Sequence, residues 1–180
     1  MASWAQFERS APDMAAVAAC LWPGIIRLGR LGEQARPGAA KAFSIAYLAT
    51  IRPDGGPRLH PFCPIIADGR LFAAIPARSP KGNDLRRDGR CVIHALPGSD
   101  DDELCIRARA REVTDDATTR SLVVAVVSRS GVGGMIETAT HDPLFEFDLA
   151  LVETARWLDI GKPGTRPVRQ RWRAPRSPAG

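Results

Sequence analysis

Residues 45–75 read IAYLATIRPDGGPRLHPFCPIIADGRLFAAI, and this stretch decides the fold. Two turn signals divide it: Pro-Asp-Gly-Gly at residues 53–56, and Asp68-Gly69, a dipeptide typical of two-residue hairpins. The apolar, β-prone runs on either side of these turns are 45–52, 57–67 and 70–75. Because strands joined by such short turns lie antiparallel, we predict a three-stranded antiparallel meander.

The rest of the chain adds three strands and several short helices. The further strands are expected at residues 90–96, 103–113 and 144–152. Helices are expected at residues 12–21, at residues 80–88, and from Asp115 or Asp116 to Ser128, followed by a Gly-rich loop over residues 129–143. Six antiparallel strands with inserted helices favour a mainly β, α+β fold built as a small closed or partly closed barrel.

Arginines alternate with apolar residues along the predicted strand 103–113. The three arginines are Arg107, Arg109 and Arg111. They are expected to face solvent, or to pair with Glu146 and Asp148 if the last two strands are neighbours. Contact with a ligand or partner is the alternative.

The charge of the chain is unevenly distributed. Lys and Arg total 25 and Asp and Glu total 20, so the formal net charge is +5. Residues 162–180 hold six basic residues and no acidic one, which leaves 19 basic against 20 acidic residues, a net −1, in residues 1–161. A nearly neutral body with a basic tail makes nucleic-acid binding a minor alternative, confined to residues 162–176.

The apolar run near the N-terminus and the cysteines both bear on where in the cell the protein is located. The apolar run at residues 14–26 is too short for a bilayer, which takes roughly 20 residues, and is broken by Pro23-Gly24. We therefore expect no membrane association. The four cysteines lack a CxxC motif and metal-ligand spacing, so they are expected to be reduced thiols in a cytoplasmic protein, with no metal site.

The sequence Ser79-Pro80-Lys81 opens the helix predicted at residues 80–88. Ser is a good N-cap and Pro suits the first helical position. A helix N-terminus presents free backbone N–H groups and a positive dipole end, to which Lys81 adds a mobile charge suited to phosphate. The chain uses 22 arginines and three lysines, so lysine here is not its default cation. An anion site and a plain solvated helix start both remain open at this point.

A second candidate stretch is the run His60-Pro61-Phe62-Cys63. Two prolines close together, Pro61 and Pro64, favour an edge strand, because proline cannot donate to the ladder. An edge next to a cavity leaves backbone groups free for a flat ring, and His60 could donate to a phosphate or a ring carbonyl. A packed or solvent-facing histidine is the alternative.

The other histidines carry weaker signals. His94 lies among apolar residues, which favours a core or interface position over a ligand role. His141, in the Gly-rich loop, is a candidate lid residue or simply part of a chain connection. The chain shows no Ser-His-Asp arrangement and no paired carboxylates, so a cofactor would have to carry any reaction.

Three segments taken together resemble the pyridoxamine 5′-phosphate oxidase-like FMN-binding split-barrel superfamily, in particular its flavin/deazaflavin oxidoreductase branch. They are residues 47–61, 68–72 and 79–88. The resemblance implies a six-stranded antiparallel split barrel that forms a homodimer, with FMN or coenzyme F420 at the subunit interface. It also implies cofactor contacts from the following residues: His60, Pro61, Phe62, Cys63, Ile75, Ser79, Pro80 and Lys81.

The chain departs from the pyridoxamine phosphate oxidases themselves. They usually carry arginine where this chain has His60, threonine near Ile75, and lysine where this chain has Ile65. These departures point away from pyridoxamine phosphate as the substrate. We divide the chain into an N-terminal helical arm (1–42), the split-barrel domain (43–155) and a basic C-terminal tail (156–180).

The leading hypothesis is an oxidoreductase that binds FMN, or alternatively F420, and moves hydride to or from a small organic substrate. The main alternative is a flavin- or haem-binding carrier or sensor without turnover, and it rests on the missing acid–base groups. Catalytic residues are not assigned by the sequence.

Overall fold

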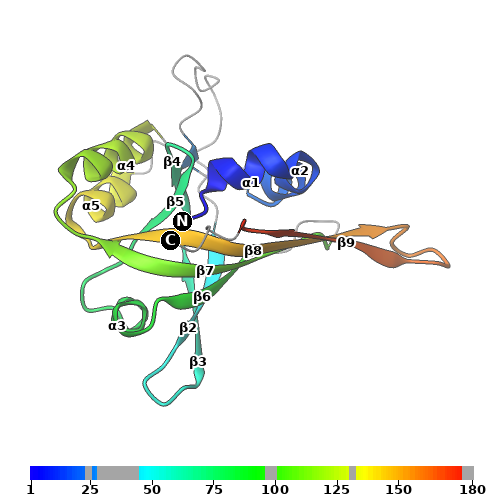
Figure 1. The fold of residues 1–180 in the computed structure, drawn as a ribbon, viewed down its shortest axis with the longest axis horizontal. Helices are drawn as coiled ribbons and strands as arrows, with labels where there is room; N and C mark the ends of the chain where they lie inside the picture. Colours follow the sequence, from blue (N-terminus) through cyan, green and yellow to red (C-terminus); the bar gives the residue numbers. More distant parts are fainter. Residues whose placement is uncertain (23–25, 28–44, 96–100, 130–132, 176–180) are drawn as a thin grey trace.

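The computed structural model describes residues 1–22, 26–27, 45–95, 101–129 and 133–175, and its strands form one curled sheet (Figure 1). The strands are β1 (Ile26–Arg27), β2 (Ala46–Ile51), β3 (Pro57–Phe62), β4 (Ile65–Ala67), β5 (Arg70–Ala74), β6 (Arg90–Ala95), β7 (Glu103–Val113), β8 (Leu144–Leu158) and β9 (Arg166–Arg173).

The sheet runs in the order β1-β4-β5-β8-β7-β6-β2-β3, and β9 pairs with β8 beside this path. Neighbouring strands in the described part of the chain are antiparallel, except for the parallel pair β1 and β4. This arrangement is the expected mainly β split barrel, with nine strands where six were predicted. The strand predicted over residues 57–67 is two strands, because the chain leaves β2 after Phe62 and pairs with β5 from Ile65 onward.

The Asp68-Gly69 turn has the conformation that its sequence predicts. Asp68 and Gly69 both have positive φ, 48° and 64°, as the commonest two-residue hairpin turn requires. The carbonyl of Gly69 also accepts a 2.8 Å hydrogen bond from the backbone N–H of Ala5. A Cβ on Gly69 would lie 2.4 Å from the Cβ of Ala5, so glycine lets this turn approach the N-terminal helix.

Five helices surround the sheet in the described residues (Figure 1). They are α1 (Trp4–Ser10), α2 (Pro12–Leu21), α3 (Pro80–Arg87), α4 (Ala117–Arg129) and α5 (Gly133–His141). The bounds of α2 match the prediction, whereas α1 was not predicted. The Gly-rich segment 129–143 was predicted as a loop, and this prediction was wrong: α5 forms there and packs with α4, where its Ala139 is buried.

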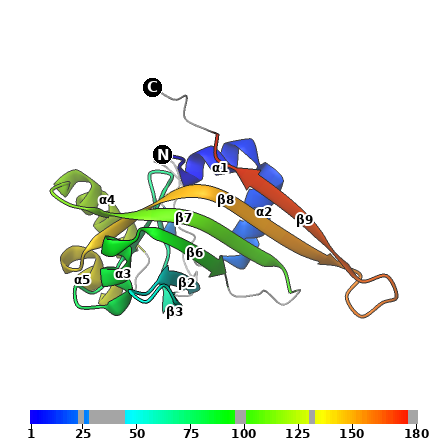
Figure 2. The same cartoon turned by 60° about the horizontal axis from the view of Figure 1, so that its bottom comes forward.

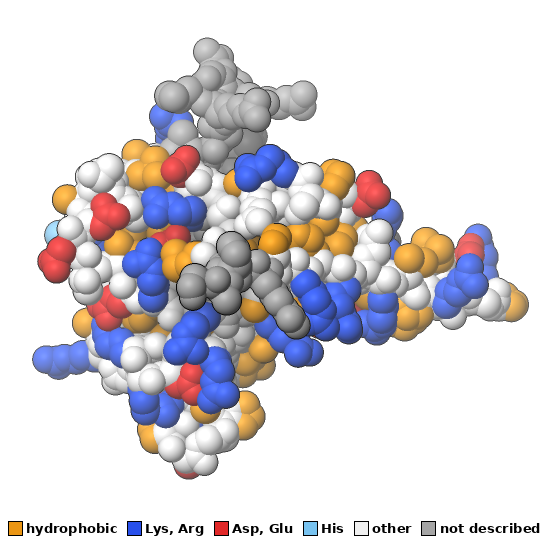
Figure 3. All heavy atoms as spheres, viewed as in Figure 1, with side chains coloured by type: hydrophobic (Ala, Val, Ile, Leu, Met, Phe, Trp, Pro, Cys, Tyr) orange, Lys and Arg blue, Asp and Glu red, His pale blue; other side chains and the backbone are white. Residues whose placement is uncertain are grey.

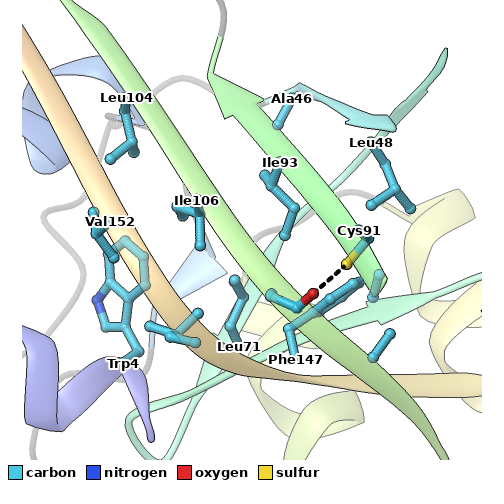
Figure 4. Packing of buried hydrophobic residues seen from close by; sticks show 14 of the residues in the cluster. Trp4, Ala46, Leu48, Leu71, Cys91, Ile93, Leu104, Ile106, Phe147 and Val152 are labelled. Carbon is cyan, nitrogen blue, oxygen red and sulfur yellow. Dashed lines mark hydrogen bonds between the residues drawn. The ribbon is translucent and has the colours of Figure 1, made fainter. Parts of the chain in front are cut away.

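Two apolar clusters hold these layers together. The larger cluster lies inside the curl of the sheet, where side chains of β2, β6, β7 and β8 converge with Leu71, Phe147 and Trp4 (Figure 4). The smaller cluster joins α4 and α5 to β4, β5 and the start of β8. Strands at that end are therefore covered on both faces.

Four aromatic rings anchor the N-terminal helices to the sheet. Trp4 stacks on Trp22 with ring centroids 5.6 Å apart, and Phe7 meets Trp172 edge-on at 5.4 Å. Burying an apolar side chain of this size stabilises the fold by about 1.5–3 kcal/mol. Trp4, Phe7 and Trp22 of the predicted N-terminal arm are thus part of the core, while the arm's boundary near residue 42 lies outside the described residues.

The last strand was predicted to end at residue 152, before the basic tail (156–180). Instead β8 continues to Leu158, and β9 pairs with its second half to make a hairpin that leaves the body (Figures 1 and 2). Figure 3 shows Lys and Arg side chains along this hairpin, mixed with apolar ones. Glu153 pairs with Arg171 at 2.6 Å and Glu103 with Arg169 at 3.4 Å, so part of the tail's positive charge is compensated within the sheet.

Within the arginine row of β7, Arg111 pairs with Glu146 as its alternation suggested. β7 and β8 are neighbours, Arg109 lies opposite Asp148, and Arg111 lies opposite Glu146. The Arg111 guanidinium contacts the buried Glu146 carboxylate at 2.6 Å. The expectation that Arg111 pairs with an acidic residue of the neighbouring strand is therefore confirmed.

Candidate cofactor site

Helix α3 begins as the sequence predicts. Ser79 occupies the N-cap with extended backbone (φ −68°, ψ 132°), and Pro80 is the first helical residue. The Ser79 side chain makes no capping hydrogen bond. Its hydroxyl and the first backbone N–H groups of the helix are therefore free of the usual N-cap contact, which leaves donors at the positive end of the helix dipole.

Lys81 connects this helix start to the edge strand of the sheet. Its Nζ donates a 2.8 Å hydrogen bond to the carbonyl oxygen of Pro61 in β3. Lys81 itself is partly buried. An ammonium has three N–H donors, so two remain after this contact. The two stretches singled out in the sequence thus meet at one side chain.

Burial shifts the acid–base properties of the residues around this contact. Partial burial lowers the pKa of Lys81 below its ordinary value of 10.5, while the nearby Cys63 acts in the opposite direction. Burial raises the pKa of the Cys63 thiol, which Lys81 counteracts. A negative charge nearby, such as that of a phosphate, would favour the protonated form of Lys81.

A buried carboxylate fixes α3 against β2 and β3. Asp84 is 3% exposed and accepts hydrogen bonds from Thr50 Oγ1 at 2.9 Å and from Arg58 Nε at 2.7 Å. Arg87 lies at 3.5 Å from its other oxygen. These contacts set the position of the turn that carries Lys81. Asp84 was missed by sequence reasoning, because an acid one turn into a short helix usually faces solvent.

His60 carries an unpaired buried nitrogen. Its Nε2 is buried and has no hydrogen-bond partner in the described part of the chain. His60 follows Arg58 by two residues in β3, so both side chains lie on the face that turns toward the core. A buried polar atom without a partner is costly, and a ligand group can supply the missing contact.

Phe62 and Ile75 are packing residues in the structure. Phe62 is 6% exposed and its ring lies 6.0 Å from that of Phe147. Ile75 is fully buried, and a Cβ on Gly82 would approach its Cγ2 to 3.3 Å. Both side chains belong to the apolar core and contribute no polar group to the candidate site.

The other two histidines lie elsewhere. His141 is the last residue of α5, in the helix pair that α5 forms with α4 (Figure 1). His94 lies on β6, where it lines a separate cavity with Trp157 at the root of the β8–β9 hairpin. Neither joins the Lys81 contact in the described residues. No helix in the described part of the chain is long and apolar enough to span a bilayer.

No protein-family model matches this chain, and no curated protein matches it. Solved structures do match. A protein from Clostridium acetobutylicum, related to general stress protein 26 and assigned to the pyridoxine phosphate oxidase family, gives a TM-score of 0.53 at 11% identity. The match covers 71% of this chain and 84% of that one.

The chain has the split-barrel fold of the pyridoxamine 5′-phosphate oxidase-like superfamily. HutZ, the haem storage protein of Vibrio cholerae, is a second match with this split-barrel fold, with a TM-score of 0.52 and 18% identity over 61% of this chain and 83% of HutZ. Campylobacter jejuni ChuZ gives a TM-score of 0.55 and 15% identity over 64% of this chain and 52% of ChuZ. At these identities the likeness concerns the split barrel itself.

Proposed function

We propose that this split-barrel protein is an oxidoreductase that binds FMN, or alternatively F420, through the start of α3, and transfers hydride to or from a small organic substrate. The observation that carries the proposal is the Lys81 Nζ–Pro61 O hydrogen bond of 2.8 Å. It holds the cation of the first helical turn beside the edge strand that contains most of the second predicted segment.

The residues present suit a phosphate-bearing ring cofactor. Lys81 keeps two N–H donors for an anion, and the N-terminus of α3 and the uncommitted Ser79 hydroxyl add polar groups. His60 offers a buried nitrogen without a partner. Phosphate would thus be held by Lys81 and Ser79, and the ring system oriented by residues 60–63.

When bound, the flavin or deazaflavin ring would supply the hydride chemistry. The chain's own task is then to bind and orient. Asp84 keeps α3 in place through Thr50 and Arg58, so the Lys81 ammonium points to one location. Pro61 lies in the adjacent edge strand β3 and Cys63 directly follows this strand, where both would border the ring.

A homodimer belongs to the same proposal. Tyr47 and Leu59, 39% and 62% exposed, lie on the face of β2 and β3 opposite the core, which we call the outer face. Pro61 shares this face as the register partner of Tyr47. A second copy related by a two-fold axis would cover this apolar patch and border the Lys81 contact.

Light scattering tests the dimer. Leu59→Glu should give monomers, because it places a charge in the patch. Val168→Glu, at a 42% exposed site on the β8–β9 hairpin, is the matched control and should leave the dimer intact. A dimer unaffected by Leu59→Glu would contradict this interface.

The four free cysteines support a cytoplasmic location, which stays a prediction.

Haem carriage is the second candidate. The comparison with HutZ favours it, as does the unpaired His60 nitrogen, because imidazole is a common haem-iron ligand. Haem carboxylates could also use Lys81. In this case the protein would bind its cofactor without turnover.

Purification from a host that makes flavins, F420 and haem distinguishes these candidates. The proposal expects a flavin or deazaflavin absorption spectrum, with the cofactor identified by mass after release. Lys81→Ala should retain much less cofactor, whereas Lys162→Ala should retain as much as the parent protein. A haem spectrum that depends on His60 would replace the leading proposal, and equal cofactor content in both lysine variants would refute it.

A further inference from the structure

A cavity of about 380 Å³ lies at the root of the β8–β9 hairpin, apart from the Lys81 contact. Its lining residues are His94, Asp101, Glu103, Trp157, Ile160 and Thr165. This volume falls within the range of small-molecule sites in proteins. The residues come from β6, the start of β7, the end of β8 and the β8–β9 turn, so four parts of the chain build it.

Two of the lining side chains, His94 and Thr165, donate a proton to backbone carbonyl groups, and this leaves acceptor atoms for the cavity. Nδ1 of His94 lies 2.6 Å from the carbonyl oxygen of Ala95. Since a carbonyl only accepts, Nδ1 carries a proton, and Nε2 is the ring nitrogen that acts as an acceptor whenever the ring is neutral. Thr165 Oγ1 likewise directs its only proton to the carbonyl oxygens of Asp159 or Lys162, at 2.7 and 2.8 Å.

Carboxylates complete this set of acceptors. Asp101 and Glu103 line the cavity, and no Lys or Arg does. Glu103 also meets Arg169 at 3.4 Å, whereas Asp101 has no ion pair within the residues that the structure describes. The cavity thus carries negative charge that its own lining does not neutralise.

Trp157 adds an aromatic wall. Its backbone N–H donates to Asp102 Oδ1 at 3.2 Å, which fixes the strand at this point. The indole π system attracts cations, and Ile160 contributes an apolar side chain beside it. An aromatic ring, an apolar side chain and several acceptors together suit a flat cation that carries N–H donors.

We propose that this cavity binds a small organic cation of the amidinium, guanidinium or protonated aromatic amine class. A metal ion fits less well, because no three His, Cys, Asp or Glu side chains of the described residues are placed to hold one. Phosphates and carboxylates would meet like charge. The site goes beyond the proposed function and does not depend on it, since Lys81 and Ser79 do not line it.

Calorimetric titration with four probes tests the ligand class. Benzamidinium is a flat cation with N–H donors, benzamide its neutral analogue, benzoate the anion, and phenyltrimethylammonium a cation without N–H donors. The proposal expects benzamidinium to bind at least about tenfold more tightly than benzamide, and benzoate not to bind. Phenyltrimethylammonium should fall between them, because it keeps only the attraction to Trp157.

Two aspartates with the same backbone conformation provide a matched pair of variants. Asp101 and Asp115 both have positive φ, 55° and 56°, which asparagine tolerates well. Asp101→Asn should weaken benzamidinium binding about tenfold, while Asp115→Asn, outside the cavity, should leave it unchanged. Trp157→Ala should also weaken it, and Trp157→Phe should restore part of the affinity.

Three results would overturn the proposal: equal affinity for benzamidinium and benzamide, no binding of either cation, or equal effects of the two asparagine variants. Because His94 is the register partner of Tyr47, the cavity borders the outer face proposed for the dimer. The titrations are therefore performed on protein of measured oligomeric state. Cofactor loss in Lys81→Ala, measured separately, distinguishes failure of the proposed function from failure of this site.

Discussion

The Nζ atom of Lys81 donates a hydrogen bond of 2.8 Å to the carbonyl oxygen of Pro61. This contact joins the first turn of α3 to β3, the last strand on the sheet's path. Within the described residues β3 pairs with a strand on one side only. Pro61 has no N–H, so its carbonyl is the backbone group that it offers to Lys81 at this edge. Lys81 therefore stands where an anion and a ring could be bound side by side.

The buried Asp84 should matter for stability through its half-buried partner Arg58. Arg58→Ala leaves a carboxylate that is 3% exposed without its main cation, and we expect a loss of about 2 kcal/mol in the free energy of unfolding. Arg52→Ala is the matched control, because its partner Asp54 is 61% exposed, and its effect should stay below about 0.5 kcal/mol. Urea unfolding measures both, and equal losses would contradict the role given to Asp84.

Trp172 should make β9 an integral part of the fold. The ring is 8% exposed, packs on Phe7, and donates from Nε1 to Ser10 Oγ at 2.7 Å. Trp172→Ala should lower the free energy of unfolding by about 3–5 kcal/mol. Val168→Ala on the same strand, at a 42% exposed site, should change it by less than about 0.5 kcal/mol. Similar urea midpoints for the two variants would mean that β9 contributes little to the core.

Thiol labelling should report on the candidate site. Burial raises the pKa of Cys91 to about 12, so this thiol should react only on unfolding, whereas exposed Cys20 should react at once. Cys63 and Cys105 are both half-buried with raised pKa values, so each should react slowly. Added cofactor should slow labelling of Cys63 and leave Cys105 unchanged. Mass spectrometry of labelled peptides gives the rates, and equal protection of both would argue against the site.

Residue types and short-range patterns in the sequence were sufficient to predict much of the fold. The turn at Asp68-Gly69 and the strand Glu103–Val113 follow from residue types and alternation alone, and the structure has both with the predicted bounds. Helix α5 was missed because Gly133 and Gly134 disfavour helix. Packing against α4, which buries Ala139, overrides that preference.

Long-range contacts could not be derived from the sequence. β9 contains Pro167 and many charges, features of a loop. It forms because an edge strand tolerates proline and because Glu153 and Glu103 pair with two of its four arginines, Arg171 and Arg169. At the candidate site, Lys81 and Pro61 were each singled out, but their hydrogen bond, and the burial of Asp84 that supports it, depend on how α3 docks on the sheet.

The lowered pKa of Lys81 should appear in the pH dependence of cofactor binding. Burial brings this pKa below 10.5, so Lys81 loses its charge at a lower pH than a free lysine. Affinity for FMN should therefore fall as the pH rises through this lowered pKa, since the neutral amine no longer attracts phosphate. Lys81→Arg should not share this decline, because guanidinium stays charged. Fluorescence titration at each pH provides the comparison, and an identical decline in the arginine variant would place the titrating group elsewhere.

The central claim is that Lys81 holds the phosphate of a ring cofactor, and the most direct test compares FMN with riboflavin, which lacks the phosphate. Equilibrium titrations of the parent protein, Lys81→Ala and the control Lys162→Ala give three FMN-to-riboflavin affinity ratios. The account predicts that the parent and Lys162→Ala favour FMN by at least about tenfold and that Lys81→Ala loses this preference. A Lys81→Ala protein that still prefers FMN as strongly as the parent would contradict it.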